Sequence, residues 1–256
     1  MADSPGNGST SSTTCAPRSP EPARRLFGRR AGRPLTARRR RLIDELLPAV
    51  ALELPAHGTI DPSAEFATPP DEVWLEVGFG KGEHLAHQAA GHPAVGLIGC
   101  EPYLGGVAGL LAAIEDRGLA NVRVFAGDAR LLLDRLAESS LDRAFVLFPD
   151  PWPKTRHRKR RFLDRAALDG LARALVDGGR LRFATDDADY LADTLALVLA
   201  RPDFLWPAEA AAAWHRPADL GPRSRCEAKA LREGRRPVHL EFVRHARAQA
   251  MSSSGR

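Results

Sequence analysis

Short apolar runs alternate with longer stretches of helical periodicity through most of the chain. The apolar runs predict strands at residues 73–78, 94–101, 121–127, 141–150, 179–186 and 237–245. The stretches beside them predict helices that end near residues 47, 90, 117, 138, 176 and 199. Strands with few polar positions that alternate with helices are typical of a parallel sheet covered on both faces. The last run, at residues 237–245, instead alternates apolar and polar residues. The pattern therefore predicts an α/β fold.

The two ends of the chain lack this pattern. Residues 1–23 are mostly Ser, Thr, Pro, Gly and Ala, a composition that predicts a disordered tail. Residues 24–50 contain an Arg-rich arm that leads into a helix. We expect one α/β domain over residues 51–248, which begins with a proline-containing connector, and a flexible end at 249–256.

Polar residues follow nearly every predicted strand at its carboxyl end. In an open parallel sheet these ends meet at one edge, and ligands bind there. The residues concerned are Glu76 to Gly82, Glu101, Asp128, Asp150, and Thr185 with Asp186. Nearly all of these strand ends carry an acid, which a parallel sheet alone does not require. The sequence therefore predicts a ligand site at this edge.

The first of these strand ends is a glycine-rich turn, Glu76-x-Gly78-x-Gly80-x-Gly82. Glycines permit a tight turn and allow the backbone to come close to a ligand. The spacing is GxGxG, which differs from the GxGxxG that places a pyrophosphate on a helix N-terminus. Acids on both sides, Glu76 and Glu83, would repel phosphate and suit a ligand with a cationic centre. The alternative is a glycine-rich turn that binds nothing.

Two further acids have both a ligand-binding and a structural interpretation. Glu101 ends the second predicted strand, where an acid typically accepts hydrogen bonds from ribose hydroxyls. Asp128 follows the third strand, where it can bind an adenine amino group or the adjacent backbone. The alternative for each is a cap, Glu101 ahead of Pro102 and Asp128 at a helix N-terminus.

Charge is distributed very unevenly along the chain. The formal net charge is +5, but residues 24–41 contain nine Arg and no acid, and residues 154–161 contain six Lys or Arg and no acid. The remainder is acidic, with 22 basic against 32 acidic residues. Two short basic segments on an acidic body predict a polyanion-binding protein. The alternative is two solvated or disordered basic runs.

Other features narrow the class of protein. We expect no membrane span, since no apolar run reaches 18 residues, and no signal peptide, since the N-terminus is polar. Cys15, Cys100 and Cys226 lie far apart, which predicts a reducing, cytoplasmic location and excludes a disulfide framework or a zinc site. His84 and His87 have helical spacing without further ligands, so we expect a solvent-facing pair and no metal.

The segment FPDPWPKTRHRKRR at 148–161 resembles the signature of bacterial tRNA (guanine-N7-)-methyltransferases, and LFGRRAGRPL, LEVGFGKGEHL and FATDDADYL agree with it. The resemblance covers residues 24–245 in order. It implies a Rossmann-like class I methyltransferase with a seven-stranded, mostly parallel sheet, helices on both faces and an antiparallel last strand. It further implies S-adenosylmethionine as cofactor, S-adenosylhomocysteine as product, and guanine 46 in the variable loop of tRNA as substrate.

The resemblance also assigns roles around the cofactor and the base. Gly78 to Gly82 surround the methionine part, Glu101 binds the ribose and Asp128 lies near the adenine. Guanine N7 carries a lone pair and no proton, so its methylation needs alignment and no general base. Asp150 is the candidate catalytic residue, because a carboxylate can accept both N1–H and N2–H of guanine. The alternative for Asp150 is an ordinary Asp-Pro turn, and Trp152 either stacks on a base or packs within the protein.

The remaining candidate residues bind the RNA. Phosphate contacts are predicted for the cations that follow Asp150, namely Lys154, Arg156, Arg158, Lys159, Arg160 and Arg161. The resemblance adds Lys154 and Asp186 as substrate contacts, and it leaves Asp187 without a role. It also adds Ser224 and Glu227 in a motif where Cys226 replaces the family's aromatic residue.

Three alternatives to this function differ in class. One is an enzyme of the same fold that acts on another RNA or a small molecule, although the basic loop argues against a small molecule. Another is a non-catalytic RNA-binding protein, against which the complete set of cofactor residues argues. The third is a dinucleotide-dependent oxidoreductase, which the GxGxG spacing disfavours. The sequence leaves the oligomeric state open, monomer or homodimer.

Overall fold

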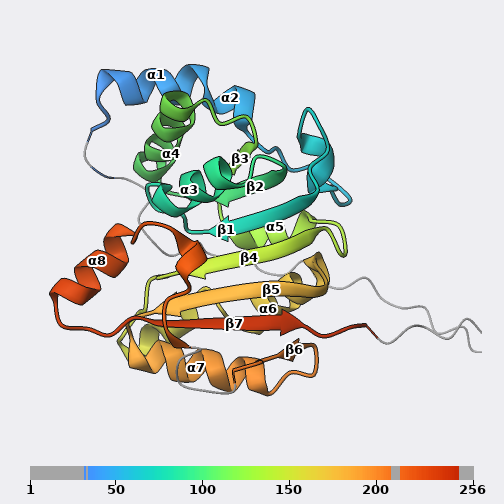
Figure 1. Ribbon diagram of the computed structural model, residues 1–256, viewed down its shortest axis with the longest axis vertical. Coiled ribbons are helices and arrows are strands. Elements are labelled where there is room, and N and C mark those ends of the chain that lie inside the picture. Colours follow the sequence, from blue (N-terminus) through green and yellow to red (C-terminus); the bar gives the residue numbers. More distant parts are fainter. Residues whose placement is uncertain (1–31, 33, 209–213, 248–256) are drawn as a thin grey trace, which may run out of the picture.

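A computed structural model describes residue 32 and residues 34–208 and 214–247. Seven strands form one sheet in the order β3-β2-β1-β4-β5-β7-β6 (Figure 1). The strands are β1 Glu72–Val77, β2 Val95–Cys100, β3 Val122–Phe125, β4 Leu141–Leu147, β5 Leu175–Thr185, β6 Phe204–Leu205 and β7 Val238–Arg244. The tails predicted at 1–23 and 249–256 lie outside the described residues.

The sheet is parallel from β3 through β5, and β7 is antiparallel to both of its neighbours. This confirms the α/β fold and the antiparallel last strand. The hydrophobic pattern alone predicted six strands and missed β6, which has only two residues, Phe204 and Leu205. Such a short edge strand has no periodicity to detect.

Helices lie on both faces of the sheet, and each face has its own core. They are α1 Ala37–Glu45, α2 Leu47–Val50, α3 Glu83–Gly91, α4 Leu104–Arg117, α5 Ala129–Arg135, α6 Arg165–Ala174, α7 Ala188–Leu199 and α8 Arg225–Arg232, with short 3-10 turns η1 Pro62–Glu65, η2 Thr155–Arg160 and η4 Ala218–Leu220. Consecutive residues of β1 face opposite cores: Trp74 packs with α1, α3 and α4, whereas Leu75 packs with α5, α6 and α7. Burial on both faces explains why the central strands read as continuous apolar runs.

Helix α6 differs from the predicted helix at both of its ends. The helix expected from about 162 begins at Arg165, since the Asp164 carboxylate accepts a hydrogen bond from Ala167 N at 2.8 Å. It ends at Ala174, and β5 follows directly. Helix α8 was not predicted. Among the described residues, no helix combines the length and apolar composition needed to cross a bilayer.

Candidate active site

The carboxyl ends of β1, β2 and β4, together with the turn after β3, line one cavity of about 290 Å³. The arrowheads of β1 and β4 end at this edge of the sheet, next to α8 (Figure 1). The lining includes six of the residues that sequence predicted for the site: Gly78, Gly80, Glu101, Asp128, Asp150 and Arg160. The expectation that these strand ends meet is therefore confirmed.

The glycine loop is held open by backbone conformations that favour glycine. Gly78, Gly80 and Gly82 have φ of 70°, 60° and 78°. A methyl group on Gly106 would lie 2.1 Å from the Gly80 carbonyl oxygen, so α4 packs directly against the loop. Any side chain at Gly106 would force the loop away from α4 and change the cavity wall.

Glu101 fastens this loop to the end of β2. Its Oε2 accepts a hydrogen bond from Gly80 N at 2.9 Å and its Oε1 accepts one from Tyr103 N at 3.0 Å. Burial raises the pKa of Glu101, the two amide donors oppose that shift, and the charge of Asp150 adds to it. Glu101 is not the cap of α4, whose N-cap is Tyr103. Each carboxylate oxygen has a further lone pair, so ribose binding stays compatible with these bonds.

Glu76 has a partner that sequence analysis missed. Its Oε2 lies 2.7 Å from His84 Nδ1, and both residues are 5% exposed. The prediction of a solvent-facing histidine pair was wrong for His84, because the α3 face that carries it packs on the sheet with its ring against Phe145 at 4.9 Å. His87 is half-buried, and burial lowers its pKa. The position of His84, eight residues beyond Glu76 across a glycine turn, gives no recognisable sequence pattern.

Asp128 caps α5. Its Oδ1 accepts a hydrogen bond from Arg130 N at 3.0 Å, and the residue is 9% exposed at the cavity wall. The structural interpretation of Asp128 is therefore confirmed. The adenine contact remains a prediction.

Asp150 is exposed at the cavity rim on a strained loop. Phe148 and Trp152, on either side of it, have φ of 53° and 47°, which non-glycine residues seldom adopt. The Asp150 carboxylate makes no hydrogen bond or ion pair with any residue in the described parts of the chain. The hydrogen-bonding capacity of this carboxylate is thus unused among the described residues.

The six predicted phosphate-binding cations differ in how exposed their side chains are. Lys154, Arg156 and Lys159 are exposed. Arg158 is half-buried and its Nη2 donates to Asp189 Oδ2 at 2.7 Å. Arg160 is also half-buried, with its guanidinium 4.8 Å from the centroid of the Trp152 ring. These five remain candidates for phosphate contacts, the three exposed ones most directly.

Arg161 has a different position, and its predicted phosphate contact is corrected. It is 3% exposed; Nε donates to the Pro151 carbonyl at 2.7 Å and Nη1 to the Asp189 carbonyl at 3.2 Å. It also pairs with Asp193 and lies over the Tyr190 ring at 4.7 Å. A guanidinium buried among these partners supports the loop from beneath, and it is not exposed to a phosphate on the surface.

Part of the first basic segment is paired within the chain. Arg38 pairs with Glu115 and Asp116 on α4, and Arg41 pairs with Glu115. These contacts fix α1 on α4. The arginines of the arm before residue 32 lie outside the described residues.

The predicted substrate contacts from the second half of the chain have structural partners as well. Asp186 pairs with Arg235. Asp187, which had no predicted role, caps α7 by accepting a hydrogen bond from Tyr190 N at 2.7 Å. Substrate contact by Asp186 stays a prediction.

Ser224 and Glu227 together begin α8. Ser224 Oγ accepts a hydrogen bond from Glu227 N at 3.2 Å, which is the N-cap arrangement. Glu227 is 3% exposed and its carboxylate lies 2.9 Å from Arg216 Nε. Between them, Cys226 reaches the cavity wall. Burial raises the pKa of the Cys226 thiol, and the carboxylates of Glu83, Asp150 and Asp186 raise it further.

Comparisons with known proteins agree on one family. The family described as "Putative methyltransferase" matches residues 70–240. A tRNA (guanine-N(7)-)-methyltransferase of Rhodospirillum rubrum is 49% identical over 91% of this chain and 92% of its own. One of Rhodopseudomonas palustris is 48% identical over 86% and 88%. The 16S rRNA methyltransferase KamB superposes with a TM-score of 0.51 at 17% identity over 69% of this chain and 89% of its own, which shows a shared fold.

Proposed function

Because this chain belongs to the family of tRNA (guanine-N(7)-)-methyltransferases, we propose that it transfers the methyl group of S-adenosylmethionine to N7 of a guanine in tRNA. We assign the target to guanine 46 in the variable loop, on the resemblance of the loop at 148–161 to the family signature. A cytoplasmic location is part of this proposal, since tRNA is the substrate.

The cavity fits the proposed cofactor. It combines glycine backbone at Gly78 and Gly80 with two carboxylates, Glu101 and Asp128, in a volume of about 290 Å³. Carboxylates are suitable partners for ribose hydroxyls, an adenine amino group and a nearby sulfonium charge. S-adenosylmethionine, when bound, supplies an electrophilic methyl group on that sulfonium.

The protein's task is then to place guanine N7 in line with the methyl group. N7 has no proton to lose, so the reaction needs no general base, and rate acceleration comes from alignment and from stabilising charge on the purine. Asp150 can accept N1–H and N2–H on the opposite edge of guanine, and its negative charge favours a purine that becomes positive. Adenine lacks this pair of donors, so the same contact selects guanine.

The observation that carries the proposal is the unused carboxylate of Asp150 at the rim of this cavity. It stands on a loop whose strained residues, Phe148 and Trp152, hold it between the cavity and the exposed cations. Lys154, Arg156 and Lys159 follow on the same loop and are placed to hold RNA phosphates while the cavity receives the base.

The test is to incubate the protein with a tRNA transcript and S-adenosylmethionine labelled in the methyl group, and to map N7-methylguanosine by position. Label at guanine 46 is expected, and a transcript with adenine at that position should gain none. Label at a different guanine would correct the position and keep the activity. A transcript that gains no label at any guanine would refute the proposal, provided that calorimetry shows binding of S-adenosylhomocysteine.

A further inference from the structure

The segment that contains α8 is a third basic region. In the sequence analysis its residues are part of the acidic remainder of the chain. Residues 223–236 carry six Arg or Lys against two Glu. Both acids are engaged within the chain. Glu227 is buried against Arg216 and lies 3.6 Å from Arg223 Nε, and Glu233 pairs with Arg235 and Lys229. The cations of this segment outnumber its acids, so its exposed surface is positive.

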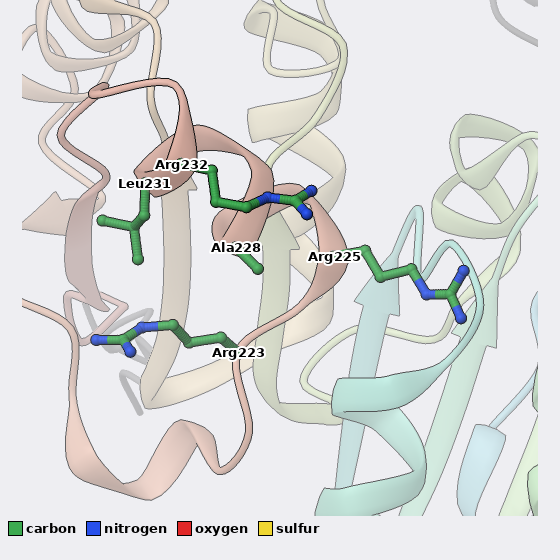
Figure 2. A pocket seen from close by; sticks show the side chains of 5 residues that line it. All are labelled: Arg223, Arg225, Ala228, Leu231 and Arg232. Atoms are coloured by element: carbon green, nitrogen blue, oxygen red, sulfur yellow. The ribbon is translucent and has the colours of Figure 1, made fainter.

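An open hollow of about 530 Å³ lies on this surface. In Figure 2, Ala228 and Leu231 face the hollow, with Arg223 on one side of it and Arg232 on the other. Leu231 is 43% exposed, and the Arg223 side chain is 62% exposed. Arg232 is exposed and makes no ion pair with any residue in the described ranges. The hollow thus offers cations around a small apolar floor.

The hollow adjoins the proposed active site. Arg225 lines the hollow, and the next residue, Cys226, lines the cavity. The lining of the cavity also includes Trp152 and Arg160, which belong to the cationic loop, residues 148–161. The cavity therefore borders two basic segments of the chain, and Asp150 lies at its rim.

Helix α8 is fixed relative to the cavity at both ends. Arg225 reaches across to α3, where its Nε lies 3.0 Å from Glu83 Oε1, and Figure 2 shows its side chain directed that way. Arg235, just beyond the helix, pairs with Asp186 after β5. The basic surface is consequently preformed.

We propose that this hollow, with Arg223 and Arg232 as its cations and Leu231 as its floor, binds the sugar–phosphate backbone of the tRNA at a surface separate from the cationic loop. This inference rests on the proposed function and extends it to a second RNA-contacting surface. The charge is complementary to phosphate, and an exposed leucine between arginines suits a ribose or the face of a base. Two separate contacts would fix the direction in which the RNA crosses the cavity.

The test compares Arg223→Gln/Arg232→Gln with a matched control, Arg117→Gln/Arg180→Gln. The control removes the same charge at the far end of α4 and at the start of the paired part of β5, away from the carboxyl edge. Arg225 is left in place because its contact with Glu83 supports the loop beside the cofactor. Binding of labelled tRNA is measured at several salt concentrations.

Each phosphate contact contributes about 0.9 to the slope of log affinity against log salt. Loss of two contacts should lower this slope by up to about 1.8. If the variant and wild type bind equally at about 1 M salt, the variant should bind up to about 60-fold more weakly than wild type at about 0.1 M. The affinity for S-adenosylhomocysteine should be unchanged, and the control should behave as wild type. The slope should fall equally for tRNAs of different sequence.

Three results would overturn the inference, and they are distinguishable. If wild type methylates tRNA and both double variants keep its salt slope, the hollow does not bind RNA and the proposed function stands. If the α8 variant changes the sedimentation coefficient and not the slope, the surface joins copies of the chain. If wild type neither binds nor methylates tRNA, both proposals fail together.

Discussion

Replacement of Asp150 by Asn tests the central contact at almost constant shape. The carboxylate is exposed and has no hydrogen bond or ion pair to lose among the described residues, so unfolding free energy should change by less than about 0.5 kcal/mol. In the complex, the amide oxygen replaces only one acceptor, and the amide NH2 then faces a guanine donor. The change therefore separates base recognition from stability.

The magnitude follows from two hydrogen bonds to a charged acceptor, each about 1.5–3 kcal/mol. Asp150 is hydrated before the base arrives, so we take about two thirds of their sum, about 2–4 kcal/mol. This lowers kcat/KM by a factor of roughly 30 to 1000. Affinity for S-adenosylhomocysteine should stay the same or rise slightly, because the charge of Asp150 raises the pKa of Glu101 and hence opposes its ionised form.

The assay is single-turnover methylation of tRNA, with calorimetric titration of S-adenosylhomocysteine and urea unfolding on the same preparation. Asp71→Asn is the matched control, because Asp71 is an exposed carboxylate ahead of β1, at the opposite edge of the sheet. A folded Asp150→Asn enzyme with kcat/KM within about threefold of the control would refute recognition of guanine by this carboxylate.

Four further outcomes are expected. Glu101→Ala should weaken S-adenosylmethionine binding by about 1.5–3 kcal/mol in calorimetry, and unchanged affinity in a folded protein would exclude the ribose contact. Replacing Lys154, Arg156 and Lys159 by Gln should lower the slope of log tRNA affinity against log salt by up to about 2.7, whereas equal slopes would exclude phosphate contacts by these cations. Arg161→Met should lower the free energy of unfolding by about 1.5–3 kcal/mol in urea titrations, since the half-buried Pro151 carbonyl and Asp193 carboxylate lose their donor. Lys154→Met is its control, and equal midpoints would show that Arg161 does not hold the loop. His239 is buried, and burial lowers its pKa to about 4. The unfolded chain therefore binds a proton that the folded chain does not, and the free energy of unfolding falls by up to about 3 kcal/mol as pH drops from about 6.5 to about 4. His239→Leu should lose this part of the pH dependence, and a pH profile identical to that of wild type would contradict the assignment.

Sequence predicted those features that depend on local pattern. The continuous apolar runs of β1, β2 and β4 follow from burial on both faces, and the strand ends then bring Glu101, Asp128 and Asp150 to one cavity. Charge counting could not separate Lys154, which is exposed, from Arg161, which is buried. That difference arises only when α7 packs beneath the loop.

Partners that lie far apart in the chain were also missed. The contact of Arg225 with Glu83 joins residues more than a hundred positions apart, and no periodicity links them. The cap at Asp187 is local, but the sequence analysis gave this residue no role. Helix α8 was not predicted, because its short amphipathic pattern lies within a segment rich in arginine.

The position of β7 has a consequence for folding. This strand pairs on one side with β5 from Arg180 to Thr185 and on the other with β6 at Phe204 and Leu205. Strand β6 precedes β7 in the chain and, among the described strands, pairs only with β7. Strand β6 therefore cannot join the sheet until β7, the last strand of the chain, has paired with β5. Until then β5 presents an open edge to other molecules, and such edges promote intermolecular pairing. Recovery of the native protein from denaturant should therefore fall as protein concentration rises, with the unfinished edge of β5 as the point of association.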